Sequence, residues 1–208
     1  MRSSLGLILL LATTLVLASA HAQTADDIAS LRTQAVRAFA EGKYAEAAKQ
    51  QQNLVRLLEP LDRTAGKPGK ATAQALGVFA YYALFARRFP EALAASRRGR
   101  SLDDDEVWID SNRAHALMYL GREKEARQLY LAHRNKRMPS GLLWQDDIED
   151  DFVKLTNAGI GHAAMPRMMQ ALGIKQPRGA FERALPSRFA QVWRPCQPVN
   201  ATQRQLSV

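Results

Sequence analysis

Cysteine is the scarcest residue of this 208-residue chain, with Cys196 as the only one. A single cysteine cannot form a disulfide within the chain, and it excludes four-thiolate metal sites and two-cysteine redox motifs. Catalytic motifs are missing as well, because the sequence has no HExxH pattern, no glycine-rich phosphate loop and no Gly-x-Ser-x-Gly turn. We therefore expect no metal, no cofactor and no enzymatic activity, and a fold stabilised by packing.

Long apolar runs are absent after the N-terminus. Arg2 is followed by the thirteen-residue uncharged stretch Leu5–Leu17, and Ala20-His21-Ala22 then supplies the small residues of a signal peptidase site. We predict that residues 1–22 are a cleaved signal peptide and that the mature chain begins at Gln23. The alternative is an uncleaved anchor, but a membrane-spanning helix needs about 20 apolar residues. The mature protein is expected to be periplasmic or secreted, without a transmembrane span.

Acidic residues are almost absent from the last part of the chain, although the whole chain has a net charge of +9. Residues 165–208 contain seven basic residues against Glu182 alone, whereas residues 23–164 contain 21 basic and 19 acidic residues. We predict a helical domain over 23–164, followed by a short helix and a basic, proline-containing tail over 165–208. Export argues against nucleic acid, so an envelope lipid, a cell-wall polymer or an acidic protein is the expected anionic partner.

The tail interleaves arginines with apolar residues that include Phe181 and Phe189. Its arginines are candidate contacts to an anionic envelope surface: Arg183, Arg188 and Arg194. Two alternatives remain open at this point. The tail can fold back over the last helices and cover their apolar flank, or it can be a solvated segment that keeps the protein soluble.

An internal repeat organises the region before the tail. Three segments each combine a turn with a following Glu-Ala pair, at residues 42–47, 87–92 and 121–126. The second and third are 34 residues apart, and the first and second are 45 apart, which is 34 plus an insertion of eleven. Apolar residues recur at helical spacing on both sides of each turn. The polar segment Pro60–Lys70 contains two prolines and two glycines, so it is expected to be the inserted loop.

The placement of glycine, aromatic residue and alanine around these turns resembles the tetratricopeptide repeat family over about residues 28–138. The segment NRAHALMYLGREKEARQLYL, residues 112–131, is similar to the terminal repeat of a group of bacterial tetratricopeptide proteins, and Trp144, Asp151-Phe152 and His162 extend the similarity. The resemblance implies an all-α, right-handed solenoid of about three repeats with closing helices, and no enzymatic activity. Arg87 departs from the pattern because glycine is usual there.

In proteins of this resemblance the first helices of the repeats line a concave groove that binds a peptide. The matching candidate positions here are Arg32, Tyr81, Trp108, Ser111, Asn112 and His115. An asparagine can hold a peptide backbone and aromatic residues can bury apolar side chains. The alternative is that Tyr81 and Trp108 pack between repeats. The expected function is a non-enzymatic adaptor for an envelope protein or peptide, with attachment to an anionic lipid or cell-wall polymer through the tail as the alternative.

Polar residues near the end of the helical domain are expected to be structural. A helix over about 142–157 should close the stack, with its acidic run within residues 146–151 on a solvated face. That run lacks the glycine turn and the spaced ligands of a calcium loop, so we expect no cation site. His133 is expected to flank a helix C-terminus, and His162 to hydrogen-bond locally.

Overall fold

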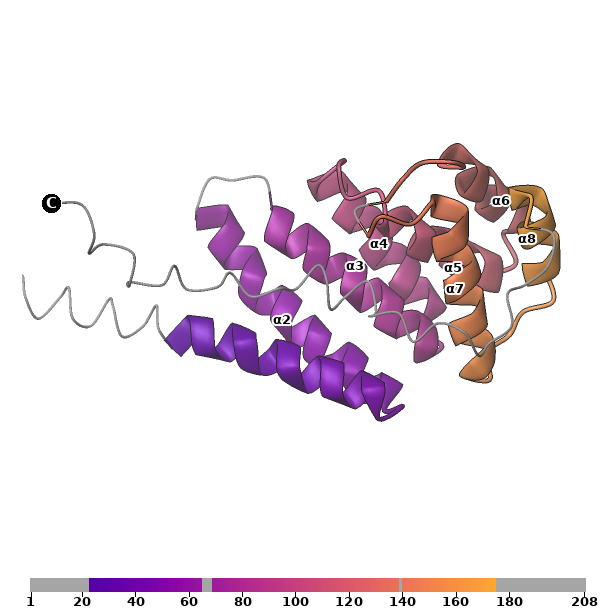
Figure 1. Cartoon of the computed structure of the whole chain (residues 1–208). Helices are drawn as coiled ribbons and strands as arrows, with labels where there is room; N and C mark the ends of the chain where they lie inside the picture. Colours follow the sequence, from indigo (N-terminus) through magenta and orange to yellow (C-terminus); the bar gives the residue numbers. More distant parts are fainter. Residues whose placement is uncertain (1–22, 65–68, 139, 175–208) are drawn as a thin grey trace, which may run out of the picture.

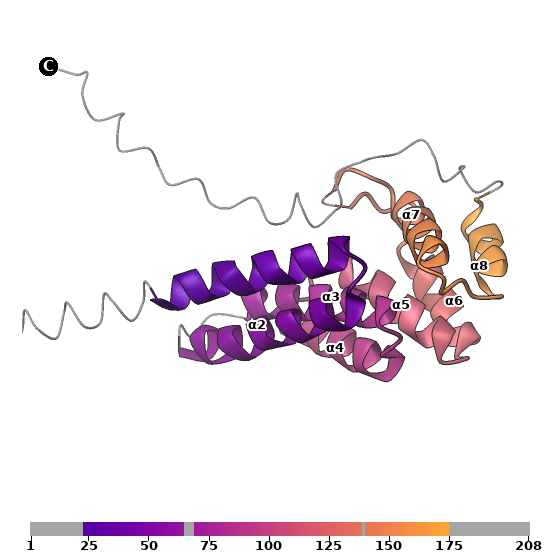
Figure 2. The same cartoon turned by 90° about the horizontal axis from the view of Figure 1, so that it is seen from below.

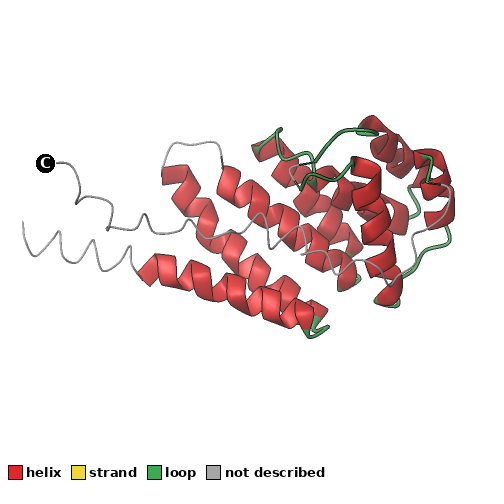
Figure 3. Cartoon of the chain, viewed as in Figure 1, coloured by secondary structure: helices red, strands yellow, loops and turns green. Residues whose placement is uncertain are grey.

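The computed structural model describes residues 23–64, 69–138 and 140–174. Within these residues the chain is all-helical and contains no strand, apart from an isolated bridge between Arg137 and Leu143. Figure 3 shows helices joined by short loops. The predicted all-α fold class is therefore confirmed. None of the helices in this part of the chain combines the length and the apolar character needed to cross a membrane.

The helices follow one another in a stack. The first helix of the described part, called the first helix below, covers residues 23–40. It is followed by α2 (Tyr44–Thr64), α3 (Lys70–Phe85), α4 (Phe89–Leu102), α5 (Ile109–Tyr119), α6 (Glu123–Ala132), α7 (Trp144–Asn157) and α8 (Met165–Leu172). From α2 to α6 each helix packs on the next, and α3 also contacts α5. Figures 1 and 2 show the first helix and α2 at one end of the molecule, and α6, α7 and α8 at the other.

The three predicted turns are confirmed, and they share one backbone geometry. Each contains a residue with positive φ, namely Gly42 at 72°, Arg87 at 59° and Gly121 at 74°. In each turn this residue donates to the carbonyl three residues earlier and the next residue donates to the carbonyl five residues earlier, at 2.8–3.0 Å. This pattern ends an α-helix with a left-handed residue. Arg87 adopts it although a left-handed conformation costs a non-glycine residue about 1–2 kcal/mol.

The predicted inserted loop is shorter than expected. Helix α2 continues through Pro60 to Thr64 and α3 begins at Lys70, so the prediction was wrong for residues 60–64 and for Lys70, while residues 65–68 lie outside the described part. The physical reason is a contact across the insertion. One carboxylate oxygen of Asp62 accepts hydrogen bonds from the backbone N–H and the hydroxyl of Thr72, at 2.9 and 2.6 Å. Asp62 thus stabilises the first turn of α3 from the last turn of α2.

Helix α3 and the start of α5 approach each other closely at Gly77. A Cβ atom at this position would lie 2.9 Å from Cζ3 of Trp108 and 2.8 Å from Cγ1 of Ile109. The carbonyl of Gly77 also accepts a hydrogen bond of 3.0 Å from the side-chain amide of Asn112. Glycine is favoured here because a Cβ atom would overlap the side chains of Trp108 and Ile109 unless they shift.

Aromatic residues fill the interface among the first helix, α2 and α3. The Phe39 ring stacks on Tyr82 with 4.7 Å between centroids and meets Phe85 edge-on at 4.9 Å. Tyr44, the first residue of α2, lies 5.3 Å from Phe39 and 5.1 Å from Phe85. Aromatic pairs at such distances add to the stability gained from burying their area. This cluster holds the first helical pair against the second.

The helix predicted over about 142–157 is confirmed as α7, with Ile148, Phe152 and Leu155 buried. The expected solvated acidic face was wrong in part, because Asp147, Glu149 and Asp151 are only 4%, 4% and 0% exposed. None of these three carboxylates is without a partner. Burial is tolerated because a buried charge that is hydrogen-bonded or paired avoids most of its desolvation cost.

Helix α8 follows α7; the sequence predicts this short helix over residues 168–172, and the structure extends it back to Met165. It begins at Met165, because Pro166 lies in its first turn, where a proline does not interrupt the hydrogen bonding. Met165, Met168 and Leu172 are buried. Helix α8 contacts α6 and α7, so these three helices form one end of the stack.

Candidate functional site

Five of the six predicted peptide-binding residues are buried in this structure. Their exposed fractions are 2% for Tyr81, 5% for Trp108 and 0% for Ser111, Asn112 and His115. Arg32, on the first helix, is partly buried. Burial agrees with the alternative in which Tyr81 and Trp108 pack between helices. In this conformation a peptide has almost no surface to contact on these five side chains.

The structure uses Trp108, Ser111 and Asn112 for internal contacts. Trp108 packs against Gly77, and its indole N–H donates to the carboxylate of Glu106. The Ser111 hydroxyl donates to the Trp108 carbonyl at 2.8 Å, and the Asn112 amide donates to the Gly77 carbonyl. These bonds fix the start of α5 against α3.

His115 belongs to a buried network that joins three helices. Its Nδ1 lies 2.7 Å from the hydroxyl of Tyr130 on α6, and its Nε2 lies 3.1 Å from a carboxylate oxygen of Asp151 on α7. Burial, and secondarily the charge of Asp151, raise the pKa of Tyr130 well above its ordinary value, so its hydroxyl stays protonated. An Asp-His-Tyr chain could transfer protons, but all three residues are 0% exposed and no substrate reaches them here. The network joins α5, α6 and α7 through three side chains.

A second polar cluster surrounds Asp110, which is 4% exposed. One of its carboxylate oxygens lies 3.1 Å from Nε of Arg100 and 3.0 Å from Nε2 of His133, and Arg113 lies 3.7 Å from the other. His133 ends α6 as its C-cap, as predicted. His162 also bonds locally as predicted, since its Nδ1 accepts from the Ala164 N–H at 3.2 Å. The bonds of Asp110 to Arg100 and His133 connect α5 with α4 and with the end of α6.

The first accessible hollow is the α2–α4 groove, which we define as the space of about 440 Å³ between α2 and α4 above α3. Its floor is apolar and includes Val55, Leu76 and Phe79. An ion pair of 2.6 Å between Arg98 of α4 and Glu59 of α2 crosses it. Ala94 lines this groove and is exposed.

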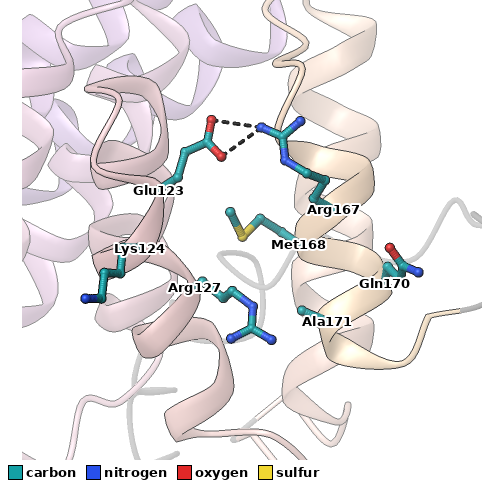
Figure 4. A pocket seen from close by; sticks show the side chains of 7 residues that line it. All are labelled: Glu123, Lys124, Arg127, Arg167, Met168, Gln170 and Ala171. Carbon is teal, nitrogen blue, oxygen red and sulfur yellow. Dashed lines mark hydrogen bonds and ion pairs between the residues drawn. The ribbon is translucent and has the colours of Figure 1, made fainter.

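The second hollow is the α6–α8 groove, a space of about 550 Å³ between these two helices (Figure 4). Its lining residues are Glu123, Lys124, Arg127, Arg167, Met168, Gln170 and Ala171. Figure 4 shows the Arg167 side chain directed at Glu123 across the groove, with Met168 and Arg127 between the helices. A single guanidinium nitrogen of Arg167 lies 2.9 and 2.8 Å from the two carboxylate oxygens of Glu123.

Sequence reasoning missed the α6–α8 groove. Glu123 and Arg167 are 44 residues apart, so no local spacing indicates that they meet. The sequence of α6 gave no signal either, because its Lys124 and Arg127 are balanced by Glu123 and Glu125. Among the residues that the structure describes, neither Lys124 nor Arg127 forms an ion pair, and both are exposed.

Two groups of predicted features lie outside the described residues. These are the signal peptide, residues 1–22, and the candidate anionic-surface contacts Arg183, Arg188 and Arg194. Within the described ranges, no group of three or more His, Cys, Asp or Glu side chains is arranged to hold a metal ion.

Comparison with known proteins gives no match to any family model, curated protein or solved structure. The functional assignment therefore depends on the residues and the geometry described above.

Proposed function

We propose that this chain is a non-enzymatic, tetratricopeptide-like adaptor that binds a protein or peptide partner in the bacterial envelope. The observation that carries the proposal is the shared geometry of the three turns at Gly42, Arg87 and Gly121. Two of them are 34 residues apart, the length of a tetratricopeptide unit. The proposed architecture is a right-handed solenoid of about three helical hairpins, closed by α7 and α8.

The proposed partner surface differs from the one expected from the sequence. Stacked helical repeats bury a continuous core and offer extended surfaces for binding. Since Trp108, Asn112 and His115 contribute to the buried side of this stack, we assign binding to the exposed grooves. The α2–α4 groove offers an apolar floor with a charged rim, and the α6–α8 groove offers cations above a buried methionine. Both combinations suit protein surfaces, which mix apolar contacts with polar rims.

The proposed location follows from residues 1–22 as a cleaved signal peptide. Expression of the full chain with a C-terminal epitope in a bacterial host, followed by fractionation and N-terminal sequencing, tests this part. The expected result is a mature periplasmic or secreted protein that begins at Gln23. A full-length cytoplasmic product would contradict the proposed location.

Affinity capture from cell envelopes tests the adaptor function. Ala94→Glu and Ala171→Glu place a charged side chain in the α2–α4 and the α6–α8 groove, respectively. Ala29→Glu is the matched control, because Ala29 is an exposed helical alanine outside both grooves. We expect one captured partner that is lost with at least one groove variant and retained with the control. Equal capture by all three variants, or no partner with the wild-type chain, would contradict the proposal.

A further inference from the structure

The α6–α8 groove carries a charge excess of one sign. Three cationic side chains line it, Lys124, Arg127 and Arg167, against one carboxylate, Glu123. Arg167 and Glu123 remain 61% and 39% exposed in their side chains although they are paired. Arg134 extends the positive region, because its guanidinium lies against Gly173 at the C-terminal end of α8. Such a surface attracts anionic groups and repels cationic ones.

Glu123 and Arg127 mark two positions on the α6 side of the groove. Glu123, which holds Arg167, and Arg127 are four residues apart on α6 and therefore lie on one helix face about 6 Å apart. In an extended peptide, residues i and i+2 point to the same side and are separated by about 6.6 Å. Two carboxylates spaced in this way would reach Arg167 and Arg127 together.

We propose that the α6–α8 groove binds an extended acidic segment of a partner protein, with carboxylates at positions i and i+2 paired to Arg167 and Arg127. Glu123 forms an ion pair with Arg167 in the free protein, and the first carboxylate of the ligand replaces Glu123 in that pair. The inference rests on the proposed adaptor function, since it names the chemistry of the partner.

A protein segment fits this groove better than an anionic membrane surface does. Met168 and Ala171 form an apolar floor between the helices, and Met168 is only 3% exposed. A narrow segment with short apolar side chains can enter a hollow of about 550 Å³ and contact this floor. A flat lipid surface would meet the exposed cations and leave the floor uncovered. The side-chain amide of Gln170 also offers a hydrogen-bond donor and acceptor to a peptide backbone.

The experiment uses the purified mature chain and fluorescein-labelled peptides in an anisotropy titration. The probe peptide contains Glu-Leu-Glu between glycine and serine residues, and the control peptide contains Glu-Glu-Leu, which has the same charge but directs adjacent carboxylates to opposite sides. We expect tighter binding of the probe, and weaker binding as salt concentration rises. Arg127→Ala and Arg167→Ala should each reduce affinity about fivefold, the size of an exposed charge pair.

Two further variants sharpen the test. Glu123→Gln frees Arg167 and should raise affinity about two- to fivefold. Arg37→Ala is the matched control, because it removes an exposed arginine of the first helix and should leave affinity unchanged. Helical circular dichroism should be unaltered in every variant, since the substituted side chains are exposed or partly exposed.

Three results would overturn the inference: no binding of the probe, equal binding of both peptides, or an unchanged affinity after Arg127→Ala. Binding of phosphatidylglycerol vesicles through these arginines, without peptide binding, would also overturn it. Failure of the peptide experiment while Ala94→Glu still abolishes envelope capture would leave the adaptor function in place. If the peptide does not bind and Ala94→Glu does not alter envelope capture either, the adaptor function is contradicted as well.

Discussion

Gly77→Ala is expected to destabilise the protein, although it replaces glycine by the best helix former in the interior of α3. The new Cβ would lie 2.8 Å from Ile109 Cγ1 and 2.9 Å from Trp108 Cζ3, whereas carbon atoms pack best at about 3.5–4.0 Å. Both neighbours are buried, at 0% and 5% exposure, so neither can move into solvent without loss of packing. The close crossing of α3 and α5 depends on this position.

The magnitude follows from two opposing terms. Replacing a helical glycine by alanine gains about 0.5–1 kcal/mol, while overpacking a core costs about 1–3 kcal/mol. The contacts are well below the packing optimum, so the cost should lie near the upper end. We expect the free energy of unfolding to fall by about 2 kcal/mol, which lowers the melting temperature by about 4–8 °C.

Urea unfolding followed by circular dichroism measures this change. Trp108→Phe supplies the matched background, because phenylalanine is shorter and lacks the outer indole atoms, including Cζ3, that meet the new methyl group. In that background the cost of Gly77→Ala should shrink by about 1–2 kcal/mol, the coupling expected between residues in contact. Stabilisation of the wild-type chain by Gly77→Ala, or an equal cost in both backgrounds, would contradict the predicted overlap with Trp108.

Three further changes test other parts of the structure. Tyr130→Phe leaves Nδ1 of His115 buried without its partner and should cost about 1–3 kcal/mol in urea unfolding; an unchanged midpoint would argue against the network. Gly121→Ala forces a left-handed alanine with no nearby atom to clash and should cost about 1–2 kcal/mol, whereas no cost would contradict the turn geometry. Burial raises the pKa of Tyr82 to about 12, while the unfolded value is about 10, so the unfolded chain loses its proton first. The stability contributed by neutral Tyr82 is complete below pH about 10, and the free energy of unfolding should fall by about 1.4 kcal/mol per pH unit from there toward pH about 12. If the free energy of unfolding of Tyr82→Phe falls as steeply with pH as that of the wild type, Tyr82 is not the cause of the fall.

The turns of the fold could be predicted because their determinants are local. A glycine with positive φ and two hydrogen bonds within six residues define each helix end, so the residues around Gly42 and Gly121 carry the information themselves. Arg87 shows that the pattern persists without glycine. Its guanidinium donates to the carbonyl of Gly159 at 2.9 Å, a contact across 72 residues that offsets part of the backbone cost.

The extent of α2 and the buried acidic residues could not be predicted, because their partners are distant in sequence. Asp62 reaches Thr72 across the insertion, and Asp151 meets His115 across 36 residues. A run of carboxylates on an amphipathic helix is ordinarily a solvated face. Only the packing of α5 and α6 against α7 shows that Asp151 is inside.

The candidate site could be predicted only in its chemical character. The resemblance indicated Trp108, Asn112 and His115 as groove positions, but the structure buries all three. Periodicity shows which residues share a face and does not show whether a further helix covers it. The α6–α8 groove forms where Arg167 reaches Glu123, 44 residues earlier in the sequence. This contact can be found only when the course of the chain from α6 to α8 is known.

Site-specific photocross-linking in envelopes tests the central claim, that this chain is an adaptor that binds its partner through exposed grooves. A photoreactive residue is placed at Ala94 in the α2–α4 groove, at Lys124 in the α6–α8 groove, or at Ala29 on the first helix as a control. The account predicts a discrete adduct with one envelope protein from at least one groove position and none from Ala29. Adducts that are equal at all three positions, or absent from both grooves, would contradict it.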